Sequence, residues 1–233
     1  MEIKNKVVFI TGGATGIGLA TTQQLVAEGA RVAVYTRAIP QTPDSAALKE
    51  NPNILFFEGD IREENTVRAT AQKTKETFGS LDVLINNAAI AQRKPFIETI
   101  PEDWDAIIDT NIKGTLAVTR AILPLMREQK SGTIINIASG AGLYGIENLS
   151  LYSLTKAALI NFSQSLSDEV RADNIAVFSI APGGTDTDMF RACFPGEEPL
   201  QTPQQIANII CKSIAGDIAP DDRLLIDVFR HAH

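Results

Sequence analysis

Residues that hold metals or form disulfides are scarce in this sequence. Its 233 residues include two cysteines, Cys193 and Cys211, and two histidines, His231 and His233, at the C-terminal end. The cysteines lack the spacing of metal ligands and of a Cys-x-x-Cys motif, and cysteine this sparse is typical of proteins in a reducing compartment. We therefore expect incidental thiols, no metal site and a cytoplasmic location.

Long apolar segments and excess positive charge are also missing. No uncharged apolar run reaches the roughly 18 residues that a membrane-spanning helix needs, and the N-terminus lacks the basic and apolar regions of a signal peptide. The net charge is −7, which repels polyanions such as nucleic acids and anionic membranes. We expect no signal peptide, no membrane span and no nucleic-acid or membrane partner.

Strand-like and helix-like segments alternate along the whole chain. Apolar runs rich in β-branched residues predict strands at 6–11, 31–36, 54–58, 83–85, 132–138, 175–181 and 224–229. Helical patterns lie between them at 19–28, 44–50, 63–78, 101–129, from the 139–156 stretch to 173, at 187–193 and at 203–215. This alternation predicts an α/β fold: one Rossmann-like domain over residues 1–233, a doubly wound parallel sheet of about seven strands in a three-layer αβα arrangement.

A glycine-rich turn joins the first predicted strand to the first predicted helix. Gly12, Gly16 and Gly18 leave room for a backbone approach to a pyrophosphate, which would lie against the free N–H groups and the positive end of the helix. The pattern is G-x-x-x-G-x-G, not the commoner G-x-G-x-x-G. Its position between strand and helix favours a dinucleotide cofactor, whereas a tight packing turn is the alternative.

The ends of the next strands carry candidate nucleotide contacts. After the second strand, Thr36 is neutral and Arg37 is basic. A cation there suits the 2′-phosphate of NADP, whereas an acid would suit the ribose of NAD. This favours NADP(H), unless Arg37 is only a solvated loop charge. Asp60 after the third strand could accept from an exocyclic amine or cap the following helix. Asn86 and Asn87 follow the fourth strand, where asparagine often only forms a turn.

The residues for catalysis lie between Ser139 and Lys156. Tyr152 and Lys156 are four residues apart and share one face of a helix. A nearby ammonium is expected to lower the pKa of the phenol toward neutral pH, so that Tyr152 exchanges a proton with an alcohol or carbonyl oxygen. Ser139 ends the fifth strand and would point a hydroxyl at the same oxygen. Alone, Tyr-x-x-x-Lys also fits a half-buried ring beside a solvated lysine.

Taken together, these motifs resemble those of the classical short-chain dehydrogenase/reductase (SDR) family. The matching residues span about 5–230: Thr11-Gly12-x-x-x-Gly16-Ile17-Gly18, Asp60, Asn86-Asn87-Ala88, Asn111, Ser139, Tyr152-x-x-x-Lys156 and Pro182-Gly183-x-x-x-Thr187. The resemblance implies hydride transfer between a nicotinamide and a carbonyl or alcohol carbon, with Ser139, Tyr152, Lys156 and Asn111 as catalytic residues. It implies that Lys156 holds the nicotinamide ribose, that Asn111 holds a water in a proton relay and that Asp60 binds adenine.

The resemblance also implies a set of cofactor contacts and a homo-oligomer, either a dimer or a tetramer. The contacts are Gly12, Thr15, Gly16, Ile17, Gly18, Arg37, Asp60, Ile61, Asn87, Ala88, Tyr152, Lys156, Pro182, Gly183, Thr185 and Thr187. Three features depart from the family pattern: Ala89 in place of a glycine, Thr15 where NADP-preferring members often carry a basic residue, and an Arg-His-Ala-His ending in place of Asp-Gly-Gly.

The walls of the substrate site are expected from loops 91–96, 140–149 and 184–201. These loops supply Leu143, Tyr144, Ile146, Phe190 and Phe194, which suit an apolar or mixed small-molecule substrate. The sequence thus predicts an NADPH-dependent reductase of small or medium ketones, of the 3-oxoacyl type or similar. The alternatives are an NAD-dependent alcohol dehydrogenase working in the oxidative direction and a non-catalytic dinucleotide-binding, redox-sensing protein.

Overall fold

Seven parallel strands form one sheet at the centre of the molecule. The computed structural model describes residues 2–41 and 43–228. The strands lie in the order β3-β2-β1-β4-β5-β6-β7, and every pair is parallel. Their bounds are β1 Val7–Thr11, β2 Arg31–Thr36, β3 Ile54–Glu58, β4 Val83–Asn86, β5 Gly132–Ile137, β6 Ile175–Ala181 and β7 Leu225–Asp227. The predicted doubly wound α/β fold is confirmed: from β1 the chain builds the sheet outward to β2 and β3 on one side, and then from β4 to β7 on the other.

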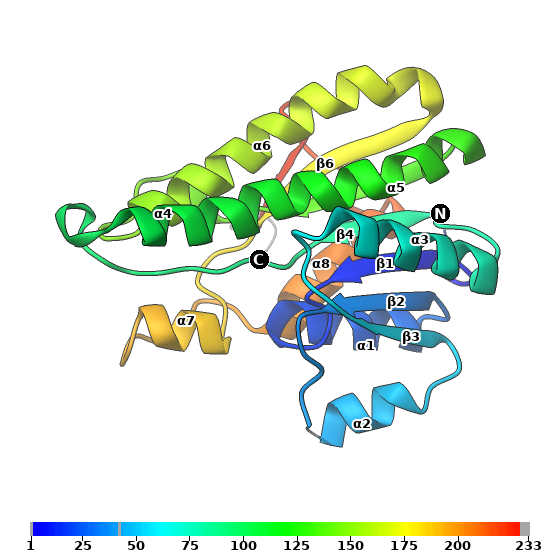
Figure 1. The fold of residues 1–233 in the computed structure, drawn as a ribbon, viewed down its shortest axis with the longest axis horizontal. Coiled ribbons are helices and arrows are strands. Elements are labelled where there is room, and N and C mark those ends of the chain that lie inside the picture. The colour runs from blue at the N-terminus through cyan, green and yellow to red at the C-terminus, as the bar shows by residue number, and fades with distance from the viewer. Residues whose placement is uncertain (1, 42, 229–233) are drawn as a thin grey trace.

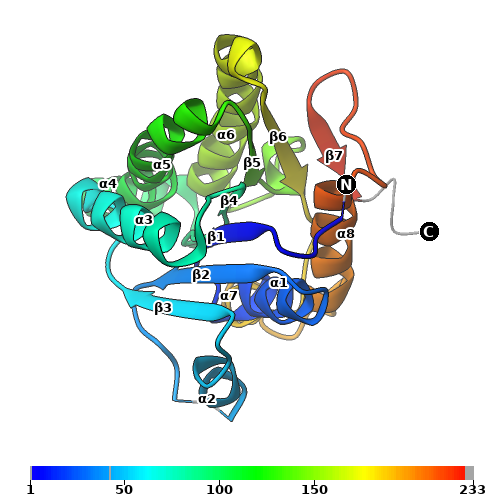
Figure 2. The same cartoon turned by 90° about the vertical axis from the view of Figure 1, so that its right-hand side faces the viewer.

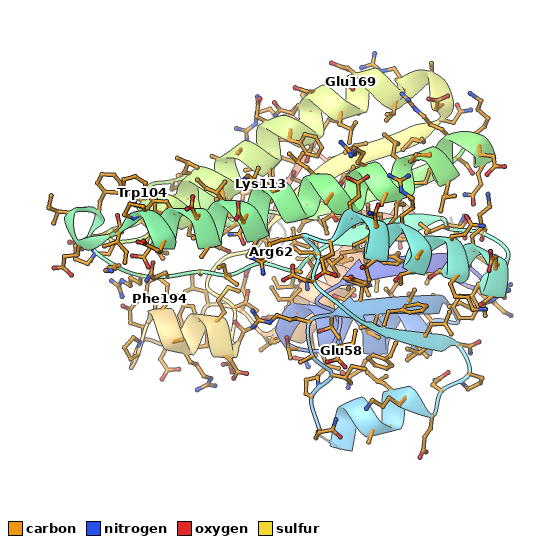
Figure 3. The ribbon with its side chains drawn as sticks, in the orientation of Figure 1. Glu58, Arg62, Trp104, Lys113, Glu169 and Phe194 are labelled. Atoms are coloured by element: carbon orange, nitrogen blue, oxygen red, sulfur yellow. The ribbon has the colours of Figure 1, made fainter. Side chains whose placement is uncertain are left out.

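Helices cover both faces of the sheet (Figures 1 and 2). One layer holds α1 Gly16–Ala27 and α8 Pro203–Ala215, which pack against each other, with α2 Pro43–Lys49 beside β3. The other holds α3 Glu64–Phe78, α5 Thr115–Gln129 and α6 Ser150–Val170. Two short helices, α4 Pro101–Ile108 and α7 Asp188–Cys193, lie beyond the carboxyl ends of the strands. Figure 3 labels Trp104 on α4 and Phe194 just after α7.

The strands are apolar on both faces because each face is covered. In β2, Val32 and Val34 join the core beneath α1 and α8, whereas Ala33 and Tyr35 join the core beneath α3, α5 and α6. All four side chains are fully buried. A continuous β-branched run is therefore what a central parallel strand requires.

The element boundaries differ from the predictions at the first helix and at the last strand. The first helix begins at Gly16 and not at 19, because Thr15 is extended and the glycine turn leads directly into the helix. The predicted interruption of the 101–129 helix is confirmed, as a π-helical segment at Asp109–Gly114 separates α4 from α5. The last strand is shorter than 224–229, since Leu224 has a φ of 56° and cannot extend it. The Arg-His-Ala-His ending and both histidines lie outside the described residues.

None of the described helices is long and apolar enough to cross a membrane.

Candidate active site

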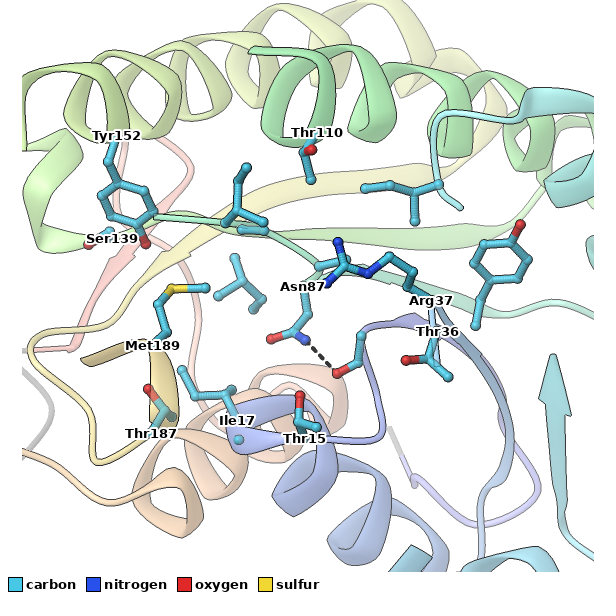
Figure 4. Close-up of a pocket in the computed structure, with 18 of the residues that line it drawn as sticks. Thr15, Ile17, Thr36, Arg37, Asn87, Thr110, Ser139, Tyr152, Thr187 and Met189 are labelled. Carbon is cyan, nitrogen blue, oxygen red and sulfur yellow. Dashed lines mark hydrogen bonds between the residues drawn. The ribbon is translucent and has the colours of Figure 1, made fainter. Parts of the chain in front are cut away.

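A cavity of about 480 Å³ lies along the carboxyl ends of the central strands (Figure 4). Of the predicted site residues, it is lined by Gly12, Thr15, Gly16, Ile17, Arg37, Asp60, Ile61, Asn87, Ala88, Ser139, Tyr152, Lys156, Pro182 and Thr187. Residues from seven separate segments of the chain thus meet at one edge of the sheet, as expected for a doubly wound fold.

The glycine turn forms a floor that side chains would fill. Gly12 and Gly16 both have positive φ values, 66° and 51°. A Cβ on Gly12 would lie 3.0 Å from the Asn87 amide nitrogen, and one on Gly16 would lie 3.0 Å from the Thr187 methyl group. The floor is therefore open backbone at the start of α1, which fits the pyrophosphate of a dinucleotide.

Gly18 has a packing role that differs from the role of Gly12 and Gly16. It does not line the cavity, and a Cβ there would lie 2.1 Å from the Gly12 carbonyl oxygen. Gly18 thus lets α1 pack closely under the turn.

The turn is held from the end of β4. The Asn87 amide donates to the carbonyl oxygens of Thr11, at 3.0 Å, and of Gly12, at 3.1 Å, as Figure 4 shows in part. The Thr11 hydroxyl in turn accepts the backbone N–H groups of Asn87 and Ala88. Asn87 is therefore more than a turn former, because it fixes the shape of the glycine turn that forms the floor of the cavity.

A guanidinium group points into the other end of the cavity. Arg37 is exposed and extends inward from the end of β2 (Figure 4). The neighbouring Thr36 hydroxyl donates to the Ala38 carbonyl at 3.0 Å. Thr36 and Arg37 line the cavity at the end of β2, so the charged group there is the Arg37 guanidinium and not a carboxylate.

Asp60 lines the same cavity as Arg37 and is paired with Arg62. Arg62 Nη2 lies 2.6 Å from Asp60 Oδ2, and this hydrogen bond, together with the nearby charges of Arg62 and Arg37, holds the pKa of the carboxyl below its usual value. The alternative that Asp60 caps the following helix is wrong, because α3 has Glu63 at its N-cap.

Ser139, Tyr152 and Lys156 meet at the inner end of the cavity. Ser139 follows β5, and its hydroxyl accepts the Ala141 N–H at 3.1 Å, which aims the side chain. Tyr152 lies in the first turn of α6, with its phenol oxygen beside Ser139 (Figure 4). Lys156 lies one turn later, and its Nζ is 5.5 Å from the centre of the Tyr152 ring. The ammonium donates to the Ile137 carbonyl at 2.7 Å.

Burial sets the proton affinities of both groups. It raises the pKa of Tyr152 to about 12, although the Ser139 hydroxyl acts in the opposite direction. It lowers the pKa of Lys156 to about 8. The lowered pKa predicted for the phenol is wrong for this structure, because burial raises it. The phenol therefore carries its proton at neutral pH.

Asn111 lies beneath the site and does not line the cavity. Its side chain is fully buried. The amide oxygen accepts the Ile90 N–H at 2.8 Å, and the amide nitrogen donates to the Ile90 carbonyl at 2.9 Å and to the Thr155 hydroxyl at 3.1 Å. Asn111 thus joins the loop after β4 to α6.

Gly183 and Thr185 shape the segment after β6 and do not line the cavity either. The Gly183 N–H donates to the Gln201 side-chain oxygen at 2.9 Å, and the Thr185 hydroxyl donates to the Gly183 carbonyl at 3.1 Å. Gln201 lies just before α8, so these bonds close a loop that presents Thr187 and α7 to the cavity.

The loops expected to form the substrate walls are joined to one another. The Lys94 N–H donates to the Asn148 carbonyl at 2.7 Å, which connects loops 91–96 and 140–149. Arg93 crosses to loop 184–201: its guanidinium lies 4.4 Å from the centre of the Phe194 ring and 3.0 Å from Glu197. None of the five apolar side chains expected to face the substrate lines the cavity, and Tyr144 is 61% exposed.

Twelve further residues line the cavity. They are Tyr35, Thr36, Gly59, Arg62, Ala89, Ile90, Ala106, Thr110, Ile137, Ala138, Asp188 and Met189. Most of them are neighbours in the chain of residues that were predicted, so the sequence could have indicated them by that proximity. Ala106 and Thr110 are different, because only the packing of α4 and the π-helical segment places them there. Met189 points toward Tyr152 in Figure 4.

Comparison with known proteins identifies the family. A model of the short chain dehydrogenase family matches residues 6–198. The chain belongs to this family. An uncharacterized oxidoreductase of Staphylococcus aureus (strain MW2) is 34% identical over 208 residues, which cover 89% of this chain and 90% of the relative. An uncharacterized oxidoreductase of Staphylococcus saprophyticus is 34% identical over 210 residues, with the same coverage.

Solved structures of the family have the same fold. Levodione reductase superposes with a TM-score of 0.87 at 26% identity, covering 97% of this chain and 96% of that one. A 3-ketoacyl-(acyl-carrier-protein) reductase from Brucella melitensis, complexed with NADH, superposes with a TM-score of 0.84 at 25% identity, covering 97% of both chains. As a short chain dehydrogenase, the protein is an NAD(P)-dependent oxidoreductase that acts on small molecules.

Proposed function

We propose that this short chain dehydrogenase is an NADPH-dependent reductase of small or medium ketones, with Tyr152 as the general acid. One observation carries the proposal: the Tyr152 phenol lies beside the Ser139 hydroxyl at the inner end of the cavity, with Lys156 one helical turn away. A phenol keeps its proton at neutral pH and can donate it as negative charge develops on a carbonyl oxygen.

Ser139, Tyr152 and Lys156 would each have a separate role in the reduction. NADPH would supply the hydride to the carbonyl carbon. Ser139 would donate a hydrogen bond to the substrate oxygen, and Tyr152 would transfer its proton to that oxygen. Lys156 lies within one helical turn of the phenol, and its ammonium would stabilise the phenolate that remains. The substrate would enter between loops 91–96, 140–149 and 184–201, near Ile90 and Met189, so its polar carbonyl would lie deepest in the cavity.

The preference for NADPH is supported by Arg37. A guanidinium that points into the cavity suits a 2′-phosphate, and the neutral Thr36 does not offer the acid that the ribose of NAD would favour. Membership of the family does not select the cofactor, because the Brucella ketoacyl reductase named above was crystallised with NADH.

Titration of the protein with NADPH and NADH, followed by the fluorescence of the reduced nicotinamide, tests this proposal. We expect NADPH to bind more tightly, and Arg37→Ala to remove about 1 to 3 kcal/mol, or roughly 5- to 150-fold, from NADPH affinity alone. Arg68→Ala is the matched control, since Arg68 is exposed on α3 and pairs with Glu64. A panel of ketones with NADPH then follows.

Equal binding of NADH would contradict the cofactor preference and favour the alternative of an NAD-dependent alcohol dehydrogenase, which a panel of alcohols with NAD would test. A Tyr152→Phe variant that kept all activity would contradict the role of the phenol and favour the non-catalytic, redox-sensing alternative.

A further inference from the structure

The Asp60 carboxylate is occupied by a single neighbouring residue. Arg62 Nε donates to Oδ1 and to Oδ2, each at 3.0 Å, and Nη2 donates to Oδ2 at 2.6 Å. The backbone N–H of Arg62 donates to Oδ1 at 2.9 Å. Both carboxylate oxygens therefore accept two hydrogen bonds, and the pair is bidentate, which is the strongest geometry for arginine and a carboxylate.

The backbone around Asp60 holds this arrangement. The Glu63 N–H donates to the Asp60 carbonyl at 3.0 Å, and the Tyr35 hydroxyl donates to the same carbonyl at 3.2 Å. Gly59 packs against Tyr35 so tightly that a Cβ there would lie 2.2 Å from the phenol oxygen. Because the turn is anchored on the buried Tyr35 side chain, Asp60 presents its carboxylate to Arg62 at the edge of the cavity.

Pairing changes what this edge offers to a purine base. A free carboxylate only accepts hydrogen bonds and would select the 6-amino group of adenine, which donates them. A guanidinium only donates, and it suits the oxo group and N7 of a 6-oxopurine. The ion pair fills the acceptor positions of the carboxylate, so the selectivity of Asp60 for the 6-amino group is lost.

We infer that Arg62 withdraws Asp60 from recognition of the base, so that this protein does not select adenine over hypoxanthine in its cofactor. Asp60 then stabilises the turn and Arg62, and shape holds the base. The inference rests on the proposed binding of the dinucleotide in this cavity with its base near Asp60, and not on the preference for NADPH.

The test compares dissociation constants for NADPH and for its deamino analogue, which carries hypoxanthine in place of adenine. Reduced nicotinamide fluorescence reports both. We expect the wild type to bind the two within about 2-fold of each other. Arg62→Ala frees the carboxylate, and since one hydrogen bond to a charged group at a partly exposed site is at stake, we expect at least a roughly 5-fold preference for the adenine form.

Two further variants test whether the Asp60 carboxylate causes that preference for the adenine form. Arg62→Ala combined with Asp60→Ala should return the ratio to within about 2-fold, because the acceptor is gone. Arg68→Ala removes the same charge from the exposed face of α3 and should leave the ratio at its wild-type value. Thermal unfolding of each variant confirms that it is folded.

Three results would overturn the inference: a preference of about 5-fold or more in the wild type, an unchanged ratio in Arg62→Ala, or a preference that survives in the double variant. Running the same ratio with NADH and deamino-NADH separates this test from the proposed function. If NADH binds as tightly as NADPH, the proposed cofactor preference fails, yet the base ratio still decides the role of Arg62.

Discussion

Lys156, in the candidate active site, is expected to make the stability of the protein depend on pH. Burial lowers its pKa from 10.5 to about 8, and its side chain is 3% exposed. Between pH 8 and 10.5 the unfolded chain therefore binds more protons than the folded protein, and the free energy of unfolding rises with pH across this window. The stability gained by releasing the Lys156 proton is lost as pH falls through 8. It amounts to about 3 kcal/mol over the whole window, of which about 1.3 kcal/mol is gained between pH 7 and pH 9.

Urea unfolding at pH 7 and pH 9 measures this effect in the wild type and in Lys156→Met. The variant lacks the titrating group, so its free energy of unfolding should increase by about 1.3 kcal/mol less than that of the wild type. The unpaired Ile137 carbonyl changes the stability of the variant at both pH values and cancels from the comparison. Other titrating groups are shared and cancel in the same way.

Lys73→Met serves as the control, because it makes the same lysine-to-methionine change at an exposed position on α3 that does not line the cavity. Its urea unfolding is measured at the same two pH values. If the pH dependence of Lys156→Met is parallel to that of the wild type, within about 0.3 kcal/mol, then the folded protein does not disfavour the ammonium and the argument from burial is refuted.

Three other variants test separate parts of the site. Tyr152→Phe should lower kcat by roughly 10²- to 10⁴-fold while NADPH affinity changes less than about 3-fold; a smaller loss in single-turnover assays would assign the proton to another group. Gly18→Ala should lower the free energy of unfolding by several kcal/mol, since its Cβ would lie 2.1 Å from the Gly12 carbonyl oxygen; an unchanged urea midpoint would contradict this packing. Arg93→Ala should speed hydrogen exchange in residues 193–197 and raise the KM for ketones, with the melting temperature nearly unchanged; unaltered exchange would show that the Arg93 contacts do not hold that loop.

Local patterns were sufficient to predict most of the fold. Parallel strands that are covered on both faces need continuous apolar runs, and β2 has one. The interruption at Asn111 and Gly114 was also predictable, since asparagine and glycine are poor helix formers. The early start of α1 and the late start of β7 depend on the backbone angles of Thr15 and Leu224, which propensities do not specify.

Most candidate site residues were predictable for a similar reason. A doubly wound sheet brings the carboxyl ends of its strands to one edge, so residues such as Arg37, Asp60 and Ser139 must gather there once the strands are recognised. Spacing alone places Tyr152 and Lys156 on one face of α6. Gly18 and Asn111 also match motif positions, but neither lines the cavity.

The linear sequence was enough to specify the strand and helix periods, the glycine turn and the spacing of Tyr152 and Lys156, because each depends on residues close together in the chain. The tertiary structure alone decided which charges the site carries and what each polar group contacts. Burial, and not the neighbouring ammonium, sets the pKa of Tyr152. Asn87 holds a turn more than 70 residues away in sequence, and Arg93 reaches Glu197 across 104 residues. Hydration and long-range contacts exist only once the chain is packed, so no local pattern encodes them.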